Sequence, residues 1–180
     1  PGGKTIGLSL SLGKNGNILS SDFSVSRINR ISTNCNRMNI KVNIFASDVL
    51  DELFHNVFDL VLLDAPCSSL GVLRRHPDTR WRLRKNKLTD FSARQKLLLN
   101  AASKAVRPGG ILVYSVCSNE PEETNCVVSS FTSDEFFVNV DESSIPKNAI
   151  DFIQPDGSLQ IKPEDGNIDG FYAMRWERKK

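Results

Sequence analysis

The feature of this sequence that most constrains its fold is the alternation of strand-like and helix-like segments. Short apolar or alternating runs of strand length are separated by segments in which apolar residues recur every three to four positions. Strands that alternate with helices are typical of an α/β protein with a mostly parallel sheet. The stretch between the last two candidate strands is rich in Pro, Asp, Asn and Gly and predicts a loop. The candidate strands are residues 17–22, 42–46, 58–63, 111–116, 136–140 and 171–176.

Three segments between these strands have helical signals. Residues 24–38 begin with a serine that can cap a helix, and residues 89–106 begin with a threonine of the same kind. A third helix is expected from Pro121, because proline suits the first helical position. The acids Glu122 and Glu123 would then face the positive end of the helix dipole.

Acidic or reactive side chains follow several candidate strands directly. Asp22, Asp48 and Asp64 stand at or just beyond the ends of the first three, and Cys117 follows the fourth. In open α/β sheets ligands bind beyond the carboxyl ends of the strands, so this edge is the expected binding site. Taken one at a time, each residue is explained equally well as a turn or capping Asp, or as a buried Cys. The nearly continuous apolar run before Asp64 predicts a strand buried on both faces.

The chain opens on a loop-like run, Pro1-Gly2-Gly3-Lys4-Thr5. Proline is not a translation initiator, and a glycine-rich loop of this kind usually follows a strand. We therefore expect a fragment that lacks its first strand, with the cofactor bound weakly and no activity when the fragment is alone. Residues 6–12 alternate with period two before Asn15-Gly16, which favours a hairpin, whereas a nucleotide-binding loop needs a helix at 5–12. The residues by themselves leave both interpretations open.

Two cysteines, Cys67 and Cys117, follow neighbouring candidate strands. With four cysteines in 180 residues, the chain is no disulfide scaffold, and its thiols are expected to be reduced and intracellular. A metal site would require more ligands than these two thiols and the distant His55 and His76 supply, so no metal is expected. The remaining interpretations are nucleophilic catalysis and two inert buried residues.

Positive charge is concentrated in residues 74–87, which hold seven of the 23 Lys and Arg and one acid, Asp78. This segment has a net charge of +6 in a chain of net charge +2, so the rest of the chain is slightly acidic. Such a patch suggests a polyanionic partner, although a solvated charged loop explains it as well. A hydrophobic content of 39% and a charged content of 24% fit a soluble globular domain, and no apolar run reaches the roughly 18 residues of a membrane helix.

Four motifs, in order, resemble one family. The runs PGGKT, DAPCSSLGVLRRHPD, RPGGILVYSVCSNEPEET and DGFYAMRW resemble the catalytic core of the RNA cytosine-C5 methyltransferases of the RsmB/Nop2/NSUN class. The similarity covers nearly the whole chain, and the Arg-Arg-His-Pro-Asp continuation is most similar to the RsmB branch, which modifies small-subunit rRNA. The resemblance implies a Rossmann-like fold of the class I S-adenosylmethionine-dependent methyltransferases, and it favours the helix at residues 5–12 over the hairpin. It also implies that residues 1–180 form one catalytic domain of a cytoplasmic enzyme that needs no membrane and no obligate protein partner.

The resemblance assigns roles to individual residues. Cys117 matches the nucleophile that adds to cytosine C6, Cys67 the second cysteine that assists product release, and Asp64 the acid near cofactor and base. The cofactor residues would be Pro1, Gly2, Gly3, Lys4, Asp22, Asp48 and Asp64, with Asp22 on the ribose and Asp48 beside the adenine. The target base must be single-stranded or flipped, and the basic segment would bind the RNA around it. The RNA-binding candidates are Arg74, Arg75, Arg80, Trp81, Arg82, Arg84, Lys85 and Lys87, although Trp81 suits a core position equally well.

Two alternatives remain at this stage. Gly3-Lys4-Thr5 and the apolar strand before Asp64 imitate the Walker elements of a P-loop nucleotidase, although two cysteine motifs have no role in such an enzyme. The second alternative is an RNA-binding scaffold that keeps the fold without turnover, and the presence of both cysteines argues against it. We expect the Cys117 thiol to need activation and consider Arg74 and Arg75 as its source.

Overall fold

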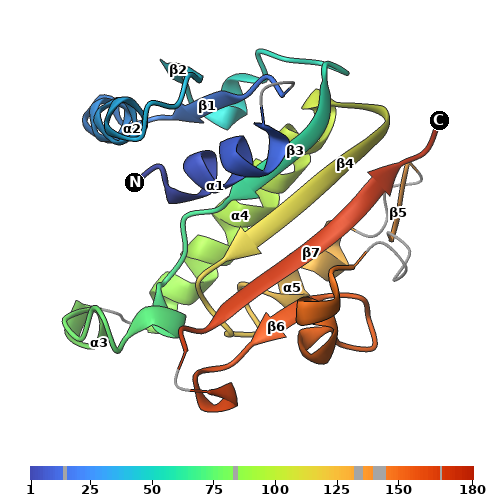
Figure 1. Cartoon of the computed structure of the whole chain (residues 1–180). Helices are drawn as coiled ribbons and strands as arrows, with labels where there is room; N and C mark the ends of the chain where they lie inside the picture. The colour runs from blue at the N-terminus through green and yellow to red at the C-terminus, as the bar shows by residue number, and fades with distance from the viewer. Residues whose placement is uncertain (14–15, 83–84, 132–135, 140–144, 167) are drawn as a thin grey trace. The chain divides into compact units, whose positions relative to one another are not determined.

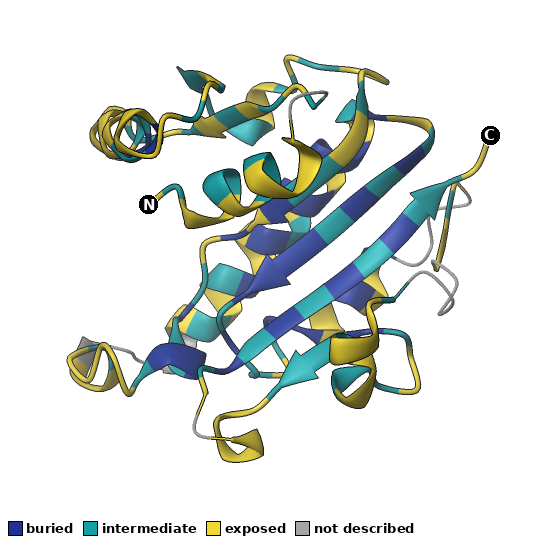
Figure 2. Cartoon of the chain, viewed as in Figure 1, coloured by how far each residue is buried: buried dark blue, intermediate teal, exposed yellow. Residues whose placement is uncertain are grey.

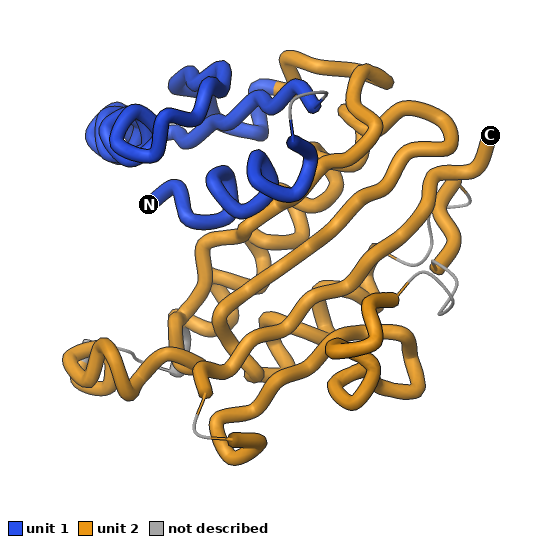
Figure 3. The backbone as a smooth tube through the Cα atoms, in the orientation of Figure 1, with its two compact units in different colours: residues 1–51 blue, residues 52–180 orange. Residues whose placement is uncertain are grey.

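The structure is a computed structural model of the chain, and it describes residues 1–13, 16–82, 85–131, 136–139, 145–166 and 168–180. The described chain divides into two compact units, residues 1–51 and residues 52–180 (Figure 3). The prediction that residues 1–180 form one catalytic domain stays a prediction. Within both units strands alternate with helices, so the α/β class is confirmed.

Unit 1 is a parallel strand pair with its helices (Figure 1). The register places Asp22, the last residue of one strand, beside Ala46 of the other. The second helix packs on both strands and buries Ile31 and Cys35, in agreement with the predicted helical spacing. The elements are α1 (Gly3–Leu12), β1 (Leu19–Asp22), α2 (Val25–Arg37), β2 (Asn43–Ala46) and the short 3-10 helix η2 (Val49–Asp51).

Helix α1 settles the conflict at the start of the chain in favour of the helix. Gly2 precedes it with a φ of 91°, a left-handed conformation that glycine adopts without strain, and the Ile6 amide bonds to the Gly2 carbonyl at 2.9 Å. Gly13 ends the helix with a φ of 62°. The period-two pattern is misleading because no residue of α1 is buried, so no face has to match its apolar positions.

Unit 2 is built on a five-stranded mixed sheet in the order β3-β4-β7-β5, with β6 paired to β7. The pair β3–β4 is parallel, whereas β7 runs antiparallel to β4, β5 and β6, so the expectation of a mostly parallel sheet holds only for the first four strands. No helix in the described ranges is long and apolar enough to cross a membrane. The strands are β3 (Phe58–Asp64), β4 (Val106–Val116), β5 (Phe137–Asn139), β6 (Leu159–Ile161) and β7 (Phe171–Arg178). The helices are α3 (Thr79–Arg82), α4 (Lys85–Ala105) and α5 (Asn125–Phe131), with the 3-10 helices η3 (Leu70–Val72), η5 (Lys147–Phe152) and η6 (Pro163–Asp165).

The core of unit 2 lies between the sheet and helices α4 and α5, which pack on each other (Figures 1 and 2). Burial alternates along β7, as expected for a strand with one face on the core. Trp176 of β7 is 2% exposed and meets Phe131 of α5 edge to face, with ring centroids 5.0 Å apart. Many of the largest fully buried side chains come from the two central strands, among them Leu112, Tyr114, Val116, Tyr172 and Trp176.

Several sequence-based expectations are wrong in detail. Strand β3 is not buried on both faces: it stands at one end of the sheet, and Leu60 is 47% exposed. Helix α4 begins at Lys85, so Thr89 lies inside it instead of capping it. The third helix begins at Asn125, because residues 121–124 form a turn. The expected loop after residue 140 contains β6, whose three residues are too few to leave a sequence pattern.

Candidate active site

The two predicted thiols meet in unit 2. Cys117 is the residue directly after β4, and Cys67 stands in the loop after β3. Their Sγ atoms are 3.1 Å apart, within hydrogen-bond distance for sulfur. Ser69 is the nearest hydroxyl, with its Oγ 3.6 Å from the Cys117 sulfur and 4.0 Å from the Cys67 sulfur. Both cysteines are half-buried.

The two thiols differ in acidity because one of them donates to the other. The hydrogen bond from Cys67 lowers the pKa of Cys117 to about 6, and the contact with Ser69 also lowers it, against burial and the Asp64 charge, which raise it. The same contact, followed by burial, raises the pKa of Cys67 far above the range of an ordinary thiol. Cys117 is therefore the more acidic thiol of the pair, and Cys67 can donate to its sulfur when Cys117 is ionised.

The activation of Cys117 therefore comes from neutral donors. The sequence suggested Arg74 and Arg75 as the source, but Arg75 is paired with Asp169 at 2.5 Å, and neither arginine is among the groups that shift the pKa of Cys117. The Cys67 thiol and the Ser69 hydroxyl lie beside the Cys117 sulfur, and each can donate a hydrogen bond to it once it is ionised.

Asp64 lies at the same edge of the sheet as the thiols. It is the last residue of β3, and the register places it beside Ser115 of β4, two residues before Cys117. The Ser115 hydroxyl donates to Asp64 Oδ1 at 3.4 Å. The exposed carboxylate and the half-buried sulfurs therefore stand at the carboxyl ends of two parallel strands, as the sequence predicted.

The loop after β3 is fixed to the end of β4 and to the start of β7 by backbone contacts. The Gly71 amide donates to the Cys117 carbonyl at 3.1 Å, and the Gly170 amide donates to the Gly71 carbonyl at 2.7 Å. A Cβ added at Gly71 would lie 2.5 Å from the Gly170 oxygen. These two glycines are required because the three segments approach within backbone contact, and this approach explains why two distant motifs, DAPCSSLG and DGFYAMRW, carry glycine there.

A buried polar cluster under the thiols was not anticipated from the sequence. Glu123 is 0% exposed and accepts hydrogen bonds from Ser68 and Gln95, although the sequence suggested that it faces a helix dipole. The sequence signal for this cluster was Gln95, a polar residue among the apolar positions of α4. A buried side-chain amide needs a polar partner.

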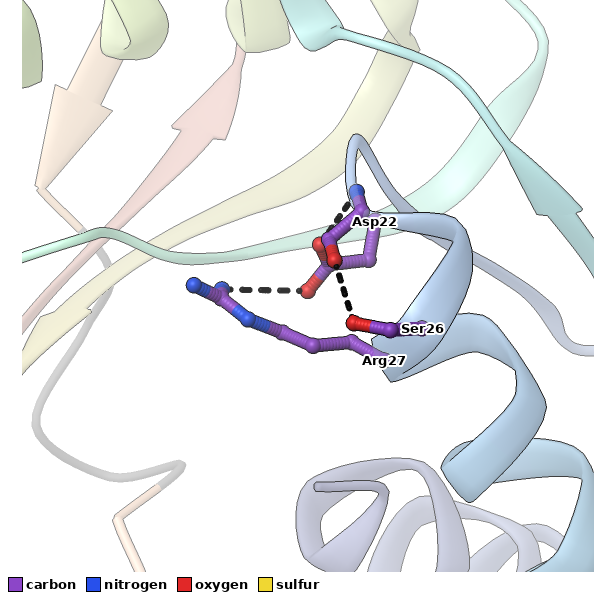
Figure 4. Close-up of polar contacts among 4 residues, drawn as sticks. Asp22, Ser26 and Arg27 are labelled. Carbon is purple, nitrogen blue, oxygen red and sulfur yellow. Dashed lines mark hydrogen bonds and ion pairs between the residues drawn. The ribbon is translucent and has the colours of Figure 1, made fainter.

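The predicted cofactor acids Asp22 and Asp48 lie together in unit 1. Asp22 Oδ1 accepts from the Ser24 amide at 2.8 Å, and its Oδ2 lies 3.4 Å from Arg27 (Figure 4). Asp22 thus caps α2, a task that the sequence assigned to the Ser24 side chain, whose hydroxyl contacts Ser26 instead. Asp48 follows β2 and accepts from the Leu50 amide at 3.1 Å. Both acids stand at the carboxyl edge of the β1–β2 pair.

The remaining cofactor candidates also belong to unit 1. Gly3 and Lys4 form the first turn of α1, and Gly2 precedes it. A Cβ at Gly2 would lie 3.5 Å from Ile31, and the Pro1 carbonyl accepts from the Asn34 side chain at 3.0 Å, so this loop rests on α2. Nothing lies within 4 Å of a Cβ added at Gly3, so the first turn of α1 is open.

The basic segment is exposed where the structure describes it. Trp81 in α3 is 85% exposed, so it is a surface residue, and its alternative assignment to the core is wrong. Arg74, Arg75, Arg80 and Lys87 are exposed as well. Arg84 lies outside the described residues, and so do the side chains of Arg82 and Lys85. The described members of the segment are thus exposed cations with an exposed aromatic ring among them in the sequence.

Comparisons with known proteins identify the family of the chain. A family model described as 16S rRNA methyltransferase RsmB/F matches residues 1–177. Ribosomal RNA small subunit methyltransferase B of Shewanella oneidensis is 33% identical over 178 residues, which are 97% of this chain and 40% of that protein. Methyltransferase F of an Enterobacter species is 32% identical over 187 residues, 99% of this chain and 38% of the relative. The chain thus spans about 40% of the length of these relatives.

A solved structure extends the agreement to three dimensions. NSun6 from Pyrococcus horikoshii with SFG superposes with a TM-score of 0.84 at 27% identity, over 100% of this chain and 46% of that chain. A similarity of this extent covers both units, and it confirms the Rossmann-like methyltransferase fold expected from the sequence.

Proposed function

The chain belongs to the 16S rRNA methyltransferase RsmB/F family, and we propose that it uses S-adenosylmethionine to methylate cytosine C5 in small-subunit ribosomal RNA. The observation that carries the proposal is the thiolate–thiol pair of Cys117 and Cys67, with sulfurs 3.1 Å apart, beside the carboxylate of Asp64. A P-loop nucleotidase would have no use for this pair. A ribosomal substrate also suggests that the reaction takes place in the cytoplasm.

The residues of unit 1 fit S-adenosylmethionine by the chemistry of their donors and acceptors. A carboxylate offers about four acceptor positions, and Asp22 uses two of them for Ser24 and Arg27, so it can accept the two ribose hydroxyls as well. The open first turn of α1 presents backbone amides that suit the methionine carboxylate. Asp48 would lie beside the adenine, Asp64 near the reacting methyl, and Pro1, Gly2, Gly3 and Lys4 along the methionine part. When bound, this cofactor supplies an electrophilic methyl group.

Cys117 supplies the nucleophile that cytosine needs. C5 of cytosine is a poor nucleophile, and addition of the Cys117 thiolate to C6 forms an S–C6 bond, breaks the C5–C6 double bond and places electron density on C5. The lowered pKa of Cys117 means that the attacking form is already present near neutral pH. Asp64 would bind the N3 and N4 edge of the base as charge develops there.

Cys67 has a role after methylation. The adduct then carries both a methyl group and a proton at C5, and a base must remove that proton so that the S–C6 bond can break and the double bond can form again. The leaving group is the Cys117 thiolate, and a hydrogen bond from the Cys67 thiol at 3.1 Å would stabilise it as it departs. Product release is thus the step for which the second thiol is needed.

The exposed basic segment supports an RNA substrate. A base inside a duplex does not reach a half-buried sulfur, so the target nucleotide must be single-stranded or flipped. Arg74, Arg75, Arg80 and Lys87 are positioned to contact phosphates, and the exposed Trp81 ring can stack on a base. Arg82, Arg84 and Lys85 complete the proposed RNA-binding segment by their position in the sequence.

The experiment follows tritiated methyl transfer from S-adenosylmethionine to 16S rRNA transcribed in vitro, using the full-length protein. Digestion of the RNA to nucleosides, followed by mass spectrometry, identifies the methylated position. The wild-type protein is expected to produce 5-methylcytidine, Cys117→Ala to produce none, and Cys67→Ala to accumulate a protein–RNA adduct that survives a denaturing gel. Cys126→Ala is the matched control, because Cys126 is exposed on α5.

Two outcomes contradict the proposal. Full activity in Cys117→Ala would exclude the covalent mechanism, and a methyl group on any atom other than C5 would exclude the substrate position. An adduct that accumulates equally in wild type and Cys67→Ala would remove the release role from Cys67.

A further inference from the structure

The most deeply buried carboxyl group in the described part of unit 2 is hydrogen-bonded to Ser68, the residue that follows Cys67. Glu123 is 0% exposed and stands in the turn between β4 and α5. Its Oε1 accepts from the Ser68 amide at 2.8 Å and from Gln95 Nε2 at 3.0 Å, and its Oε2 accepts from the Ser68 hydroxyl at 2.5 Å. All three donors are neutral. Transfer of a carboxyl group from water into the protein interior costs free energy, which these hydrogen bonds offset. The buried position of Glu123 therefore needs an explanation other than packing.

These bonds hold both neighbours of Cys67. Ser68, the residue after Cys67, donates two hydrogen bonds to Glu123. Gln95 donates to Glu123 and also to the carbonyl of Pro66, the residue before Cys67, at 2.9 Å. The backbone on each side of Cys67 is therefore attached to one rigid pair, Glu123 and Gln95.

The same cluster reaches the residue after Cys117. The Ser68 hydroxyl lies 3.3 Å from the Ser118 hydroxyl, which in turn accepts from the Glu120 amide at 3.2 Å. The Tyr114 hydroxyl of β4 donates to the Glu123 carbonyl at 2.7 Å, which attaches the turn to the strand that ends at Cys117. Burial, followed by the Glu123 charge, raises the pKa of Tyr114, so its hydroxyl remains a donor. Ser68 and Ser118 are thus joined, and each follows one of the reactive cysteines.

We propose that Glu123 is a positioning residue that, through Ser68 and Gln95, fixes Cys67 at hydrogen-bond distance from the Cys117 sulfur. This inference rests on the proposed function for its importance to turnover, although the geometry of the two thiols is independent of the substrate. Glu123 itself touches neither sulfur, and the path runs from its carboxylate through the Ser68 amide and hydroxyl to the backbone of Cys67.

The Cys67 thiol, as hydrogen-bond donor, determines in which direction the pKa of Cys117 changes. The Cys67 thiol is the largest of the interactions that lower the pKa of Cys117. If Cys67 is released from its position, this hydrogen bond lengthens, and the pKa of Cys117 rises toward that of an ordinary thiol. A smaller thiolate fraction at neutral pH then slows every reaction of Cys117 as a nucleophile.

The test measures the rate of iodoacetamide alkylation at Cys117 against pH in the full-length protein, with mass spectrometry to locate the modified residue. A Cys126→Ser background removes the exposed thiol. Glu123→Gln keeps the volume and removes the charge, and Ser68→Ala removes only the hydroxyl bonds while keeping the amide. We expect the midpoint of the pH profile to rise by about one unit in Glu123→Gln, so alkylation near pH 6 slows roughly fivefold. Ser68→Ala should move it in the same direction by less.

Two matched controls separate positioning from general stability. Glu122→Gln makes the same chemical change one residue away. The Glu122 backbone carbonyl accepts a hydrogen bond from the Ser92 hydroxyl, and the substitution leaves that carbonyl in place. Val127→Ala opens a cavity in α5, where Val127 is 0% exposed, and lowers stability without touching the cluster. Both controls should keep the wild-type midpoint, even where the melting temperature falls.

The inference is overturned if neither Glu123→Gln nor Ser68→Ala moves the midpoint, or if Val127→Ala moves it as much as they do. If Glu123→Gln does not fold, Ser68→Ala decides the matter alone, because it removes one hydroxyl and leaves the carboxylate paired with the Ser68 amide and Gln95. Iodoacetamide requires neither cofactor nor RNA. Failure of this inference is therefore distinguishable from failure of the proposed function, which is decided by detection of 5-methylcytidine.

Discussion

The sulfur atoms of Cys67 and Cys117 lie 3.1 Å apart although 50 residues separate them in the chain. The distance is a consequence of the parallel pair β3–β4, whose carboxyl ends lie side by side, and of the loop after β3, which returns so that Gly71 bonds to the Cys117 carbonyl. Because the two thiols share one hydrogen bond, only one of them is acidic. The first prediction concerns this asymmetry.

Removal of the Cys67 thiol should make Cys117 a weaker acid. In the wild type the pKa of Cys117 is lowered to about 6, so the thiolate fraction rises through pH 6 and is nearly complete at pH 7.5. In Cys67→Ala the donor is lost, the pKa rises, and the rate of alkylation at pH 7 should fall about tenfold. Cys67→Ser keeps a hydroxyl donor, so its alkylation rate at pH 7 should lie between the rates of the wild type and Cys67→Ala. Identical pH profiles in the three proteins would contradict the assignment of Cys67 as donor.

Substitution of Gly71 should destabilise unit 2 and disturb the thiol pair. A Cβ at this position meets the Gly170 oxygen at 2.5 Å and the Cys117 oxygen at 3.0 Å, and both are backbone atoms that move only with their segments. Gly71→Ala is expected to cost about 1–3 kcal/mol in the free energy of unfolding, measured by urea denaturation. Gly7→Ala is the control, because its Cβ meets nothing within 4 Å inside helix α1, and it should be neutral or stabilising. Equal stability of the two variants would be inconsistent with the observed packing.

Replacement of Asp22 should weaken cofactor binding without unfolding unit 1. Asn at this position keeps the Oδ1 acceptor for the Ser24 amide and so preserves the cap of α2, but it loses the charge that would hold the ribose hydroxyls. Hydrogen bonds to a charged group contribute about 1.5–3 kcal/mol, so the dissociation constant for S-adenosylmethionine should rise roughly 10- to 100-fold in calorimetry. Asp51→Asn in η2 serves as the control and should bind normally. Unchanged affinity in Asp22→Asn would remove Asp22 from the cofactor site.

The basic segment should contribute to RNA affinity mainly through phosphate contacts. Arg80→Ala removes an exposed cation of α3 and should reduce the slope of log affinity against log salt concentration by about 0.7 for single-stranded RNA. Arg30→Ala removes an exposed cation of α2 and should leave the slope unchanged. Fluorescence anisotropy with a labelled 16S rRNA fragment provides the measurement. A slope that is equally reduced in both variants would indicate a general charge effect instead of a localised surface.

Substitution of Trp81 distinguishes the contribution of base stacking to RNA affinity from that of positive charge, in the same anisotropy assay. The ring is 85% exposed, so Trp81→Ala should leave the melting temperature unchanged, because it removes no buried contact. If the ring stacks on a base, affinity should fall by about 1–3 kcal/mol without a change in the salt slope. Trp176→Ala, which empties a core position that is 2% exposed, should instead unfold unit 2. Unaltered affinity in Trp81→Ala would exclude it from the RNA surface.

Much of the fold was predictable because its signals are local. The strands before Asp22 and Asp64, the helix after Ser24 and the reactive position of Cys117 all follow from periodicity and from residues that end a strand. The exposure of β3 was not predictable in this way, because an apolar run has the same sequence pattern in a strand at the end of a sheet as in a central strand. The short strand β6 was missed for a related reason, since its three residues acquire their conformation from pairing with β7.

The site shows the same division between local and tertiary information. The sequence identified Cys67, Cys117 and Asp64 by motif and by resemblance, but it attributed the activation of Cys117 to nearby arginines. The structure attributes it to Cys67 and Ser69, which are neutral. Charge density is visible in a sequence, whereas a hydrogen bond between two side chains depends on distances of a few tenths of an ångström.

The sequence by itself thus determined the α/β class and the location of positive charge, because each depends on residue type and spacing along the chain, and its resemblance to a family marked Cys67 and Cys117 as the candidate reactive pair. Only the tertiary structure decided which groups tune the nucleophile and which residue holds them in place. Glu123 reads as an ordinary acid at a helix start, yet folding removes it from water and surrounds it with the Ser68 and Gln95 donors. Its effect on the thiols arises from burial and three-dimensional proximity, and neither of these is a property of the chain in one dimension.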